Sequence, residues 1–214
     1  MANTLSFPGW VQGVLRARRS ARLRRFLAPL DLPDPPRVVD VGCGIDGRSF
    51  SDHVPASWDI VGVDLEPVEL VRQAHPNFRF VHASACELPF DDKHFDLAVS
   101  IGMLEHILGD DYLRAAREMQ RVARSWVVMV PWRWAPIEPH YAFPLFGALP
   151  RPAQEWLIRH VLYRDRADDF VEYHRNNFAW RSMAQYRRDF PGSCIVMSPT
   201  FDTMAIVGGE YLRR

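Results

Sequence analysis

The chain has 214 residues, and its 26 basic and 26 acidic residues give a formal net charge of zero at pH 7. This balance excludes the strong overall field by which a protein attracts nucleic acid or an anionic membrane. Hydrophobic residues make up 48% of the chain and charged residues 24%, which excludes an intrinsically disordered protein. One domain typically has roughly 100–200 residues, so we expect a single domain over residues 1–214.

Cysteine usage and hydropathy bear on the cellular compartment. The three cysteines, Cys43, Cys86 and Cys194, form no C-x-x-C pair, which argues against a structural zinc site and a disulfide framework. The chain has no apolar leader at its start and no run of about 18 apolar residues. We therefore predict a cytoplasmic protein without a transmembrane segment.

Residues 8–28 are predicted to form a helix that begins near Pro8 and ends before Pro29. Apolar residues form a broken stripe along it, and basic residues fill its other face. The basic residues are Arg16, Arg18, Arg19, Arg22, Arg24 and Arg25. We interpret the segment as a solvated amphipathic helix packed on the domain. Contact with an anionic partner or a membrane surface stays open as the alternative.

Strand and helix patterns alternate from residue 36 to residue 130. Helical patterns lie at residues 67–74 and 112–124. Short apolar runs predict five strands, at residues 37–41, 60–64, 78–82, 95–100 and 126–130. Strands that alternate with helices predict β-α-β units and a parallel sheet with right-handed crossovers.

The alternation stops at residue 131. Residues 131–178 are rich in proline and aromatic residues, and we interpret them as a lid or substrate-binding insertion with a helix at 153–163. Their aromatic side chains would form the core of a cap, a flat apolar binding site, or both. They include Trp132, Trp134, Tyr141, Phe143 and Phe146. Residues 179–214 are expected to form a helix at 181–189 and, at one sheet edge, a hairpin of strands at 193–197 and 203–207.

A glycine-rich segment follows the first predicted strand. Gly42, Gly44 and Gly47 satisfy the pattern G-x-G-x-x-G, and Asp64 ends the next strand twenty residues beyond Gly44. Glycines let the backbone approach a ligand closely, and an acid at the end of the next strand can accept hydrogen bonds from ribose hydroxyls. The pattern predicts a nucleotide-type site at the carboxyl ends of the strands, and nicotinamide-dependent dehydrogenases share it.

Asp40 distinguishes between two classes of ligand. It lies two positions before Gly42, where a dinucleotide would place its anionic pyrophosphate and a carboxylate would repel it. Asp46 in the same loop is equally unfavourable beside a pyrophosphate. S-adenosylmethionine carries an ammonium and a sulfonium instead of phosphates, and nearby carboxylates favour those cations. The residues therefore favour S-adenosylmethionine as the cofactor.

Five short motifs, in order along the chain, carry a resemblance to a known family. Residues 40–44 (DVGCG) and 61–65 (VGVDL) resemble the first two motifs of class I S-adenosylmethionine-dependent methyltransferases. Residues 88–90 (LPF), 95–97 (FDL) and 104–106 (LEH) resemble the type 11 branch, which includes the ubiquinone and menaquinone biosynthesis methyltransferases. The resemblance implies an α/β fold, a Rossmann-like three-layer sandwich with a mostly parallel seven-stranded sheet, an antiparallel edge hairpin and the insertion as a lid.

The resemblance covers residues 36–130, and it implies which residues bind the cofactor. Asp40 and the first two glycines would frame the methionine end, and Asp64 would hold the ribose. The full implied set is Asp40, Gly42, Cys43, Gly44, Asp64, Leu65, Ser84, Ala85, Cys86, Ser100 and Ile101. The chain departs from the family at Ser84, where many relatives have an aspartate, and it lacks their Gly-Gly turn before the fifth strand.

Three residues are candidates for chemistry on the methyl acceptor. Glu138 and His140 lie beside prolines in the insertion, and either could accept a proton from a hydroxyl or an amine. His106 is the third candidate. The structural alternative is that Glu105 pairs locally and that His106 packs under the following helix. Because no H-E-x-x-H spacing occurs, we expect no metal site, and we interpret Cys43 as a packing residue.

Taken together, the motifs predict an enzyme that transfers a methyl group from S-adenosylmethionine to a small-molecule acceptor. The insertion favours an apolar or aromatic acceptor. Three alternatives stay open: an RNA or protein methyltransferase that uses the arginine-rich helix, a nicotinamide-dependent dehydrogenase, and a protein that binds S-adenosylmethionine without catalysis. The neutral charge disfavours nucleic acid as a partner.

Overall fold

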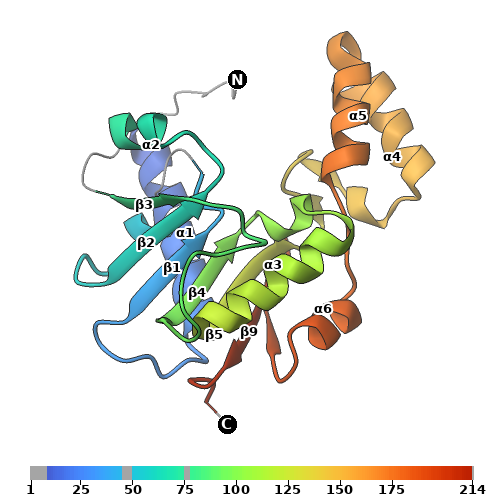
Figure 1. Cartoon of the computed structure of the whole chain (residues 1–214). Helices are drawn as coiled ribbons and strands as arrows, with labels where there is room; N and C mark the ends of the chain where they lie inside the picture. The colour runs from blue at the N-terminus through green and yellow to red at the C-terminus, as the bar shows by residue number, and fades with distance from the viewer. Residues whose placement is uncertain (1–8, 45–49, 75–77, 214) are drawn as a thin grey trace.

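The computed structural model describes residues 9–44, 50–74 and 78–213 (Figure 1). Asp46 and Gly47 of the glycine motif lie outside the described residues. Among the described residues, no helix has the length and the apolar character needed to cross a membrane.

One sheet of seven strands forms the centre of the molecule, in the order β3-β2-β1-β4-β5-β9-β8. Its parallel strands are β1 (Arg37–Val41), β2 (Asp59–Asp64), β3 (Arg79–His82), β4 (Phe95–Ile101) and β5 (Ala123–Pro131). β9 (Thr203–Gly209) pairs antiparallel with β5, and β8 (Cys194–Met197) pairs antiparallel with β9 at the sheet edge. The predicted mostly parallel sheet with an antiparallel edge hairpin is confirmed.

Six α-helices accompany the sheet in the described part of the chain. They are α1 (Gly9–Leu27), α2 (Val68–Ala74), α3 (Gly109–Val122), α4 (Arg151–Leu157), α5 (Ala167–Asn177) and α6 (Met183–Asp189). Short 3-10 turns are η1 (Ser51–His53), η2 (Leu104–His106), η3 (Phe146–Ala148) and η5 (Arg164–Arg166), and η4 (Ile158–Leu162) is a π-helical turn.

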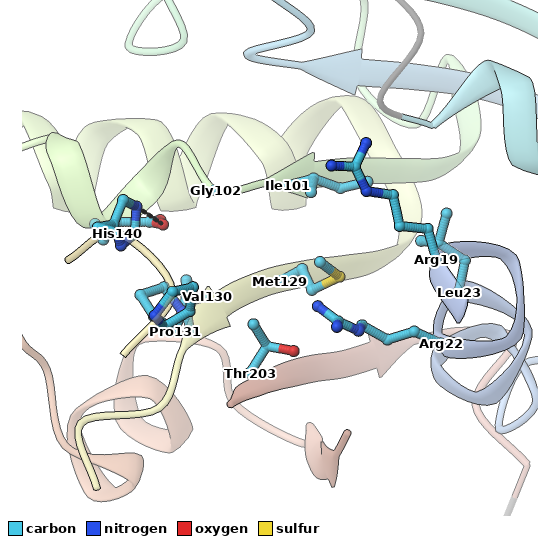
Figure 2. A pocket seen from close by; sticks show the side chains of 12 residues that line it. Arg19, Arg22, Leu23, Ile101, Gly102, Met129, Val130, Pro131, His140 and Thr203 are labelled. Atoms are coloured by element: carbon cyan, nitrogen blue, oxygen red, sulfur yellow. Dashed lines mark ion pairs between the residues drawn. The ribbon is translucent and has the colours of Figure 1, made fainter. Parts of the chain in front are cut away.

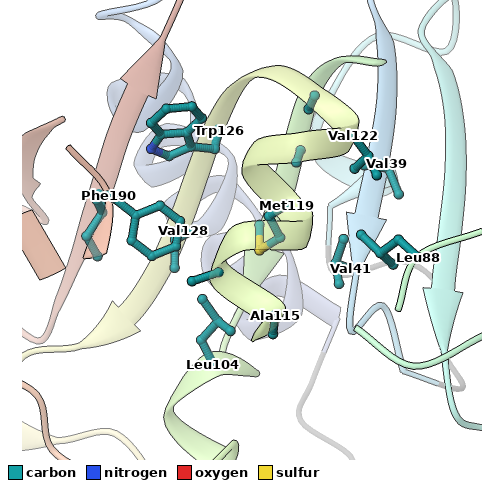
Figure 3. Packing of buried hydrophobic residues seen from close by; sticks show 14 of the residues in the cluster. Val39, Val41, Leu88, Leu104, Ala115, Met119, Val122, Trp126, Val128 and Phe190 are labelled. Atoms are coloured by element: carbon teal, nitrogen blue, oxygen red, sulfur yellow. The ribbon is translucent and has the colours of Figure 1, made fainter. Parts of the chain in front are cut away.

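Helices cover both faces of the sheet. Successive strand residues point to opposite faces, and because apolar side chains occur on both, each face is buried under helices. In β1, Val38 packs with Leu23 and Phe26 of α1, whereas Val39 packs on the other face. That second face is covered by α3, whose Met119 lies against the sheet near Phe190 (Figure 3). The result is the predicted three-layer sandwich, with its two cores on opposite faces of the sheet.

The link between α3 and β5 differs from the prediction, which started the fifth strand at residue 126. α3 ends at Val122 and β5 begins at Ala123, which already pairs with Phe95 of β4. The Lys93 ammonium donates to the carbonyl oxygens of Gln120 at 2.9 Å and Ala123 at 3.0 Å. A cation thus satisfies carbonyl groups at the helix end, and no Gly-Gly turn is needed.

The insertion after β5 contains more regular structure than the sequence indicated. It holds the hairpin of β6 (Ile137–Glu138) and β7 (Phe143–Pro144), then α4, η4 and α5. α5, which the sequence did not predict, lies beside α4 and away from the sheet in Figure 1. The insertion has a small core of its own, formed by Tyr141, Phe146, Ile158 and Val171.

Candidate active site

The loop after β1 requires glycine at two positions. Gly42 and Gly44 have φ angles of +80° and +67°, a left-handed conformation that residues with a Cβ rarely adopt. A Cβ on Gly42 would also lie 2.5 Å from Cγ of Met103. The Gly42 N–H donates to the Val63 carbonyl oxygen at 2.8 Å. These constraints hold the loop against the carboxyl end of β2.

Asp64 at the end of β2 fastens this loop. Its Oδ2 accepts a hydrogen bond from the Gly44 N–H at 2.7 Å, and its Oδ1 accepts one from the Leu65 N–H at 2.7 Å. The side chain is only partly buried, and Oδ2 has a second lone pair. Asp64 can therefore hold the loop and still accept a hydrogen bond from a ligand hydroxyl.

A cavity of about 340 Å³ opens beside this loop. Residues that the sequence predicted as cofactor-binding form about half of its lining. They are Gly42, Asp64, Leu65, Ser84, Ala85 and Cys86. The segment after β4 supplies much of the rest, including Met103, His106, Ile107 and Leu108. Sequence reasoning missed most of this wall, whose only signal was the LEH motif at residues 104–106.

The other five predicted cofactor residues, Gly44 among them, do not line that cavity. Asp40 and Ser100 are fully buried in β1 and β4, and Ile101 faces a second cavity described below. Cys43 is 3% exposed, and burial raises the pKa of its thiol. Such a thiol stays protonated, which agrees with a packing role for Cys43.

Asp40 is a buried carboxylate without a hydrogen-bond partner among the described residues. Burial, together with the nearby charge of Asp64, raises the pKa of Asp40 to about 7. A ligand with positive charges at this end of the sheet would offset the repulsion between the two carboxylates, whereas a pyrophosphate would add further negative charge beside them. The residues present therefore fit S-adenosylmethionine and do not fit a dinucleotide.

The second cavity, of about 410 Å³, lies at the carboxyl ends of β4 and β5 (Figure 2). Its apolar walls include Leu23 of α1, Ile101 of β4 and Met129 of β5. Thr203 of β9 and His140 of the insertion also line it. Five segments that are far apart in the sequence thus meet around one space, next to the predicted cofactor site.

Two arginines of α1, Arg19 and Arg22, extend into this second cavity in Figure 2. Arg22 forms an ion pair with Asp202 at 3.1 Å. Within the described ranges, Arg19 forms no ion pair. Part of the arginine face of α1 therefore lines a cavity, which differs from the fully solvated face expected from the sequence.

The predicted catalytic pair, Glu138 and His140, is joined by a hydrogen bond. Nδ1 of His140 lies 2.8 Å from Oε1 of Glu138. Oε2 of this fully buried carboxylate accepts hydrogen bonds from the N–H groups of His140 and Tyr141, both at 2.7 Å. Burial by itself lowers the pKa of His140, but the hydrogen bond and charge of Glu138 outweigh it and raise the pKa above its usual value.

His106 and Glu105 lie next to this pair. Nδ1 of His106 lies 2.7 Å from the Asn177 carbonyl oxygen, and burial lowers the pKa of the ring. Glu105 is 1% exposed and, among the described residues, has no hydrogen-bond partner, so it is not locally paired as the sequence alternative assumed. Burial raises its pKa to about 7. Nε2 of His140 lies 3.9 Å from Oε1 of Glu105, and a dashed line marks this ion pair in Figure 2.

The aromatic residues of the insertion have mainly a structural role. Tyr141 and Phe146 stack at a centroid distance of 4.2 Å in the core of the insertion, and Phe143 packs against that core. Trp134 is exposed, and Trp132 packs against the main core. None of these five side chains lines either cavity, so they do not form a flat binding site there, and only Tyr141, Phe143 and Phe146 belong to the cap core.

Comparison with known proteins identifies the central segment. Residues 39–129, which begin in β1 and end in β5, match the family model of a methyltransferase domain. This segment is similar to the methyltransferase domain family. The match covers almost the same range as the resemblance found in the sequence, and it confirms that resemblance to methyltransferases.

Curated relatives match the methyltransferase segment over part of their length. Ajmaline N-methyltransferase of Rauvolfia serpentina is 30% identical over 115 residues, 47% of this chain and 38% of that protein. Demethylmenaquinone methyltransferase of Lysinibacillus sphaericus is 33% identical over 96 residues, 41% of this chain and 40% of that protein. The chain thus spans less than half the length of these relatives.

Similarity in fold to solved structures covers nearly the whole chain. A solved structure from Methanococcus maripaludis, a candidate S-adenosyl-L-methionine-dependent methyltransferase, has a TM-score of 0.56 to this chain at 13% identity. The superposition covers 96% of this chain and 91% of that one. At this identity the match supports the fold alone. The similarity in fold covers the elements outside residues 39–129 as well.

Proposed function

We propose that the protein transfers a methyl group from S-adenosylmethionine to a small-molecule acceptor bound in the larger cavity. The observation that carries this proposal is the position of the two cavities on either side of one cluster of polar side chains, Glu105, His106 and His140. His106 lines the smaller, cofactor-type cavity, whereas Glu105 and His140 line the larger one. An acceptor in the larger cavity would lie next to a cofactor in the smaller one.

The cofactor, when bound, supplies an activated methyl group on a sulfonium, and the protein supplies alignment and a dry environment. Asp64 would hold the ribose, and Asp40 would favour the positive charges of the methionine end. Met103 and Ile107 form an apolar wall of the cofactor cavity. These residues bind and orient the cofactor. They affect the acceptor only by fixing where the methyl group lies.

His140 is the residue that we assign to contact the reacting group of the acceptor. Glu138 keeps the proton of the ring on Nδ1, so the lone pair of Nε2 is left free in the neutral ring. That lone pair can receive a proton from a hydroxyl or an amine. Glu138 acts through His140 and is therefore a positioning residue, and His106 borders the transfer position from the cofactor side.

The larger cavity also indicates the chemistry of the acceptor. Leu23, Ile101, Met129 and Val130 provide apolar surface, which supports an apolar or aromatic body. The names of the two curated relatives specify small molecules, ajmaline and demethylmenaquinone, and this supports a small-molecule acceptor here. Burial of Arg22 against Asp202 at this cavity leaves less of the arginine face of α1 for a nucleic acid.

The proposal is tested with labelled S-adenosylmethionine and a panel of apolar and aromatic hydroxyl, amine and quinol acceptors. The wild-type protein should transfer label to at least one acceptor. His140→Ala should lower turnover by about 100-fold or more, the scale of general-base catalysis, with cofactor affinity unchanged. His160→Ala removes an exposed histidine of η4 and should change neither quantity. Tight binding of the cofactor product without turnover on any acceptor would instead favour a non-catalytic binding protein.

A further inference from the structure

Three side chains of types that bind metal ions lie close together at the border of the two cavities. Glu105, His106 and His140 each have one ligand-type atom, and these three atoms lie within 4.8 Å of one another. Glu105 and His106 belong to η2, and His140 belongs to the insertion. No short sequence motif joins them, which is why the spacing of histidines in the sequence predicted no metal site.

The tautomer of each histidine is set by a partner on the outer side of its ring. Nδ1 of His106 lies 2.7 Å from the Asn177 carbonyl oxygen, which can only accept, so Nδ1 carries the hydrogen. Nδ1 of His140 donates in the same way to Glu138 at 2.8 Å. A neutral ring with its hydrogen on Nδ1 has a free lone pair on Nε2. Both rings therefore have Nε2 available as a ligand atom.

Glu105 meets the neutral ring of His140 without a donor between them. Both carboxylate oxygens are buried and accept no hydrogen bond within the described part of the chain, and Oε1 lies 3.9 Å from Nε2 of His140. When the His140 ring is neutral, its lone pair and the Glu105 carboxylate repel, and a buried charge without a partner destabilises the fold. A cation bound between the ligand atoms would remove both penalties.

We propose that Glu105, His106 and His140 bind one divalent first-row transition-metal ion. Two imidazoles and one carboxylate are a donor set that Zn²⁺ and related ions take in proteins, with Zn–N and Zn–O distances of about 2.0–2.2 Å. The surroundings fit as well, because a ligating histidine usually donates its other N–H to a carboxylate or a backbone carbonyl. Glu138 and Asn177 are those two partners here.

The bound ion would be open to the larger cavity. Glu105 and His140 both line that cavity, and three protein ligands leave at least one coordination position for a water molecule or a ligand oxygen. An acceptor hydroxyl at that position would have its pKa lowered by the ion, and His140 would then act on the acceptor through the metal. This role rests on the proposed function, whereas binding of the ion does not.

Metal binding is tested on the full chain after treatment with a chelator, with neither cofactor nor acceptor present. Zn²⁺ is titrated in competition with a chromophoric chelator, and Co²⁺ is added to a second sample to record its visible spectrum. We expect one ion per chain, and Co²⁺ absorption bands typical of coordination by nitrogen and oxygen. A wild-type protein that binds no Zn²⁺ and gives only the spectrum of aqueous Co²⁺ overturns the proposal.

Variants identify the ligands. His140→Ala and Glu105→Gln should each weaken Zn²⁺ binding by more than about 100-fold, and Glu138→Gln by about 10–100-fold, because it orients a ligand without contacting the ion. His160→Ala is the matched control and should bind like the wild type. If the ligand variants bind Zn²⁺ as tightly as the control, the ion is bound elsewhere and the assignment is wrong. Should a variant fail to fold, the Co²⁺ spectrum of the wild type still decides.

Binding of S-adenosylhomocysteine to the same preparations, measured by calorimetry, separates this inference from the proposed function. Zn²⁺ binding without any binding of S-adenosylhomocysteine would support the metal site and contradict the methyltransferase proposal. Methyl transfer by a protein that binds no metal would do the reverse. We expect both ligands to bind, with the affinity for S-adenosylhomocysteine little changed in Glu105→Gln.

Discussion

Two buried carboxylates that have no hydrogen-bond partner among the described residues mark the two halves of the candidate site. Asp40 lies in β1 beside the cofactor loop, and Glu105 lies beside His140 at the larger cavity. Folded proteins leave few buried polar groups unpaired, so each such group calls for an explanation. In both cases a cation from outside the chain provides it: the charged methionine end of the cofactor at Asp40, and the proposed metal ion at Glu105.

Asp64→Ala tests the ribose assignment. The substitution removes a charged acceptor, and loss of a hydrogen bond to a charged group costs about 1.5–3 kcal/mol of binding free energy. The affinity for S-adenosylhomocysteine, measured by calorimetry, should fall by that amount. Asp91→Ala, at an exposed position before β4, should leave it unchanged. Equal affinities of the two variants would show that Asp64 does not hold the ribose.

Asp40→Asn tests the charge argument through the pH dependence of stability. The pKa of Asp40 is about 7 in the folded protein, against 3.8 for an ordinary aspartate. The protonated form therefore stabilises the fold below pH 4, and this contribution is lost as the pH rises towards 7. Above that pH the wild type pays a cost of up to about 4 kcal/mol, which the variant avoids.

The measurement is urea unfolding of the cofactor-free protein at several pH values between 4 and 8. Asp40→Asn should gain stability relative to the wild type as the pH rises through this window, and it should bind S-adenosylhomocysteine more weakly because a favourable charge is gone. A constant difference in stability between the two proteins from pH 4 to pH 8 would contradict the raised pKa of Asp40.

At the scale of elements, η2 is the segment on which both cavities depend, and Arg181 holds it in place. The guanidinium of Arg181 donates to the carbonyl oxygens of Leu104 at 3.0 Å and Ile107 at 2.6 Å. Its Cζ also lies 3.5 Å from the ring centroid of Tyr112 in α3. One side chain from the segment before α6 thus ties η2 to α3, although nothing in the sequence singled it out.

Arg181→Lys should therefore loosen η2 without removing a charge. A lysine is a single point donor and cannot make two hydrogen bonds in a fork while stacking on a ring. We expect weaker binding of S-adenosylhomocysteine, faster amide hydrogen exchange over residues 104–107, and lower methyl transfer. Arg187→Lys, at an exposed position of α6, is the control. Unchanged exchange over η2 in Arg181→Lys would show that other contacts hold the segment.

The two halves of the site differ in how well the sequence predicted them. The cofactor half was predictable because its residues, such as Gly42 and Asp64, lie at strand ends in short contiguous motifs. The acceptor half was not, because α1, β4, β5, β9 and the insertion each contribute only one to three residues. α5 was missed for a similar reason: its buried residues, Val171 and His174, pack on the insertion rather than on the sheet, and give only a weak apolar pattern.

At the scale of the whole molecule, the sheet places the two cavities side by side, while the insertion and α1 close the larger one. Tyr141 illustrates how the insertion is held in shape. Its hydroxyl pairs with Nδ1 of the buried His174 at 2.8 Å, and Nε2 of that ring pairs with Gln154 at 2.9 Å. A rigid cap of this kind keeps Glu138 and His140 at fixed positions above strands that belong to a different part of the chain.

Ligand-induced stabilisation of the whole chain distinguishes the two cofactor classes that share the glycine motif. A ligand that binds only the folded state adds about 2.7 kcal/mol of stability at 100 times its dissociation constant. For a chain of this size, 1 kcal/mol raises the melting temperature by about 2–4 °C. S-adenosylmethionine or S-adenosylhomocysteine should therefore raise it by about 5–10 °C. NAD should give no shift, because its pyrophosphate would lie against Asp40. A shift with NAD and none with S-adenosylhomocysteine would contradict both the cofactor assignment and the charge argument on which it rests.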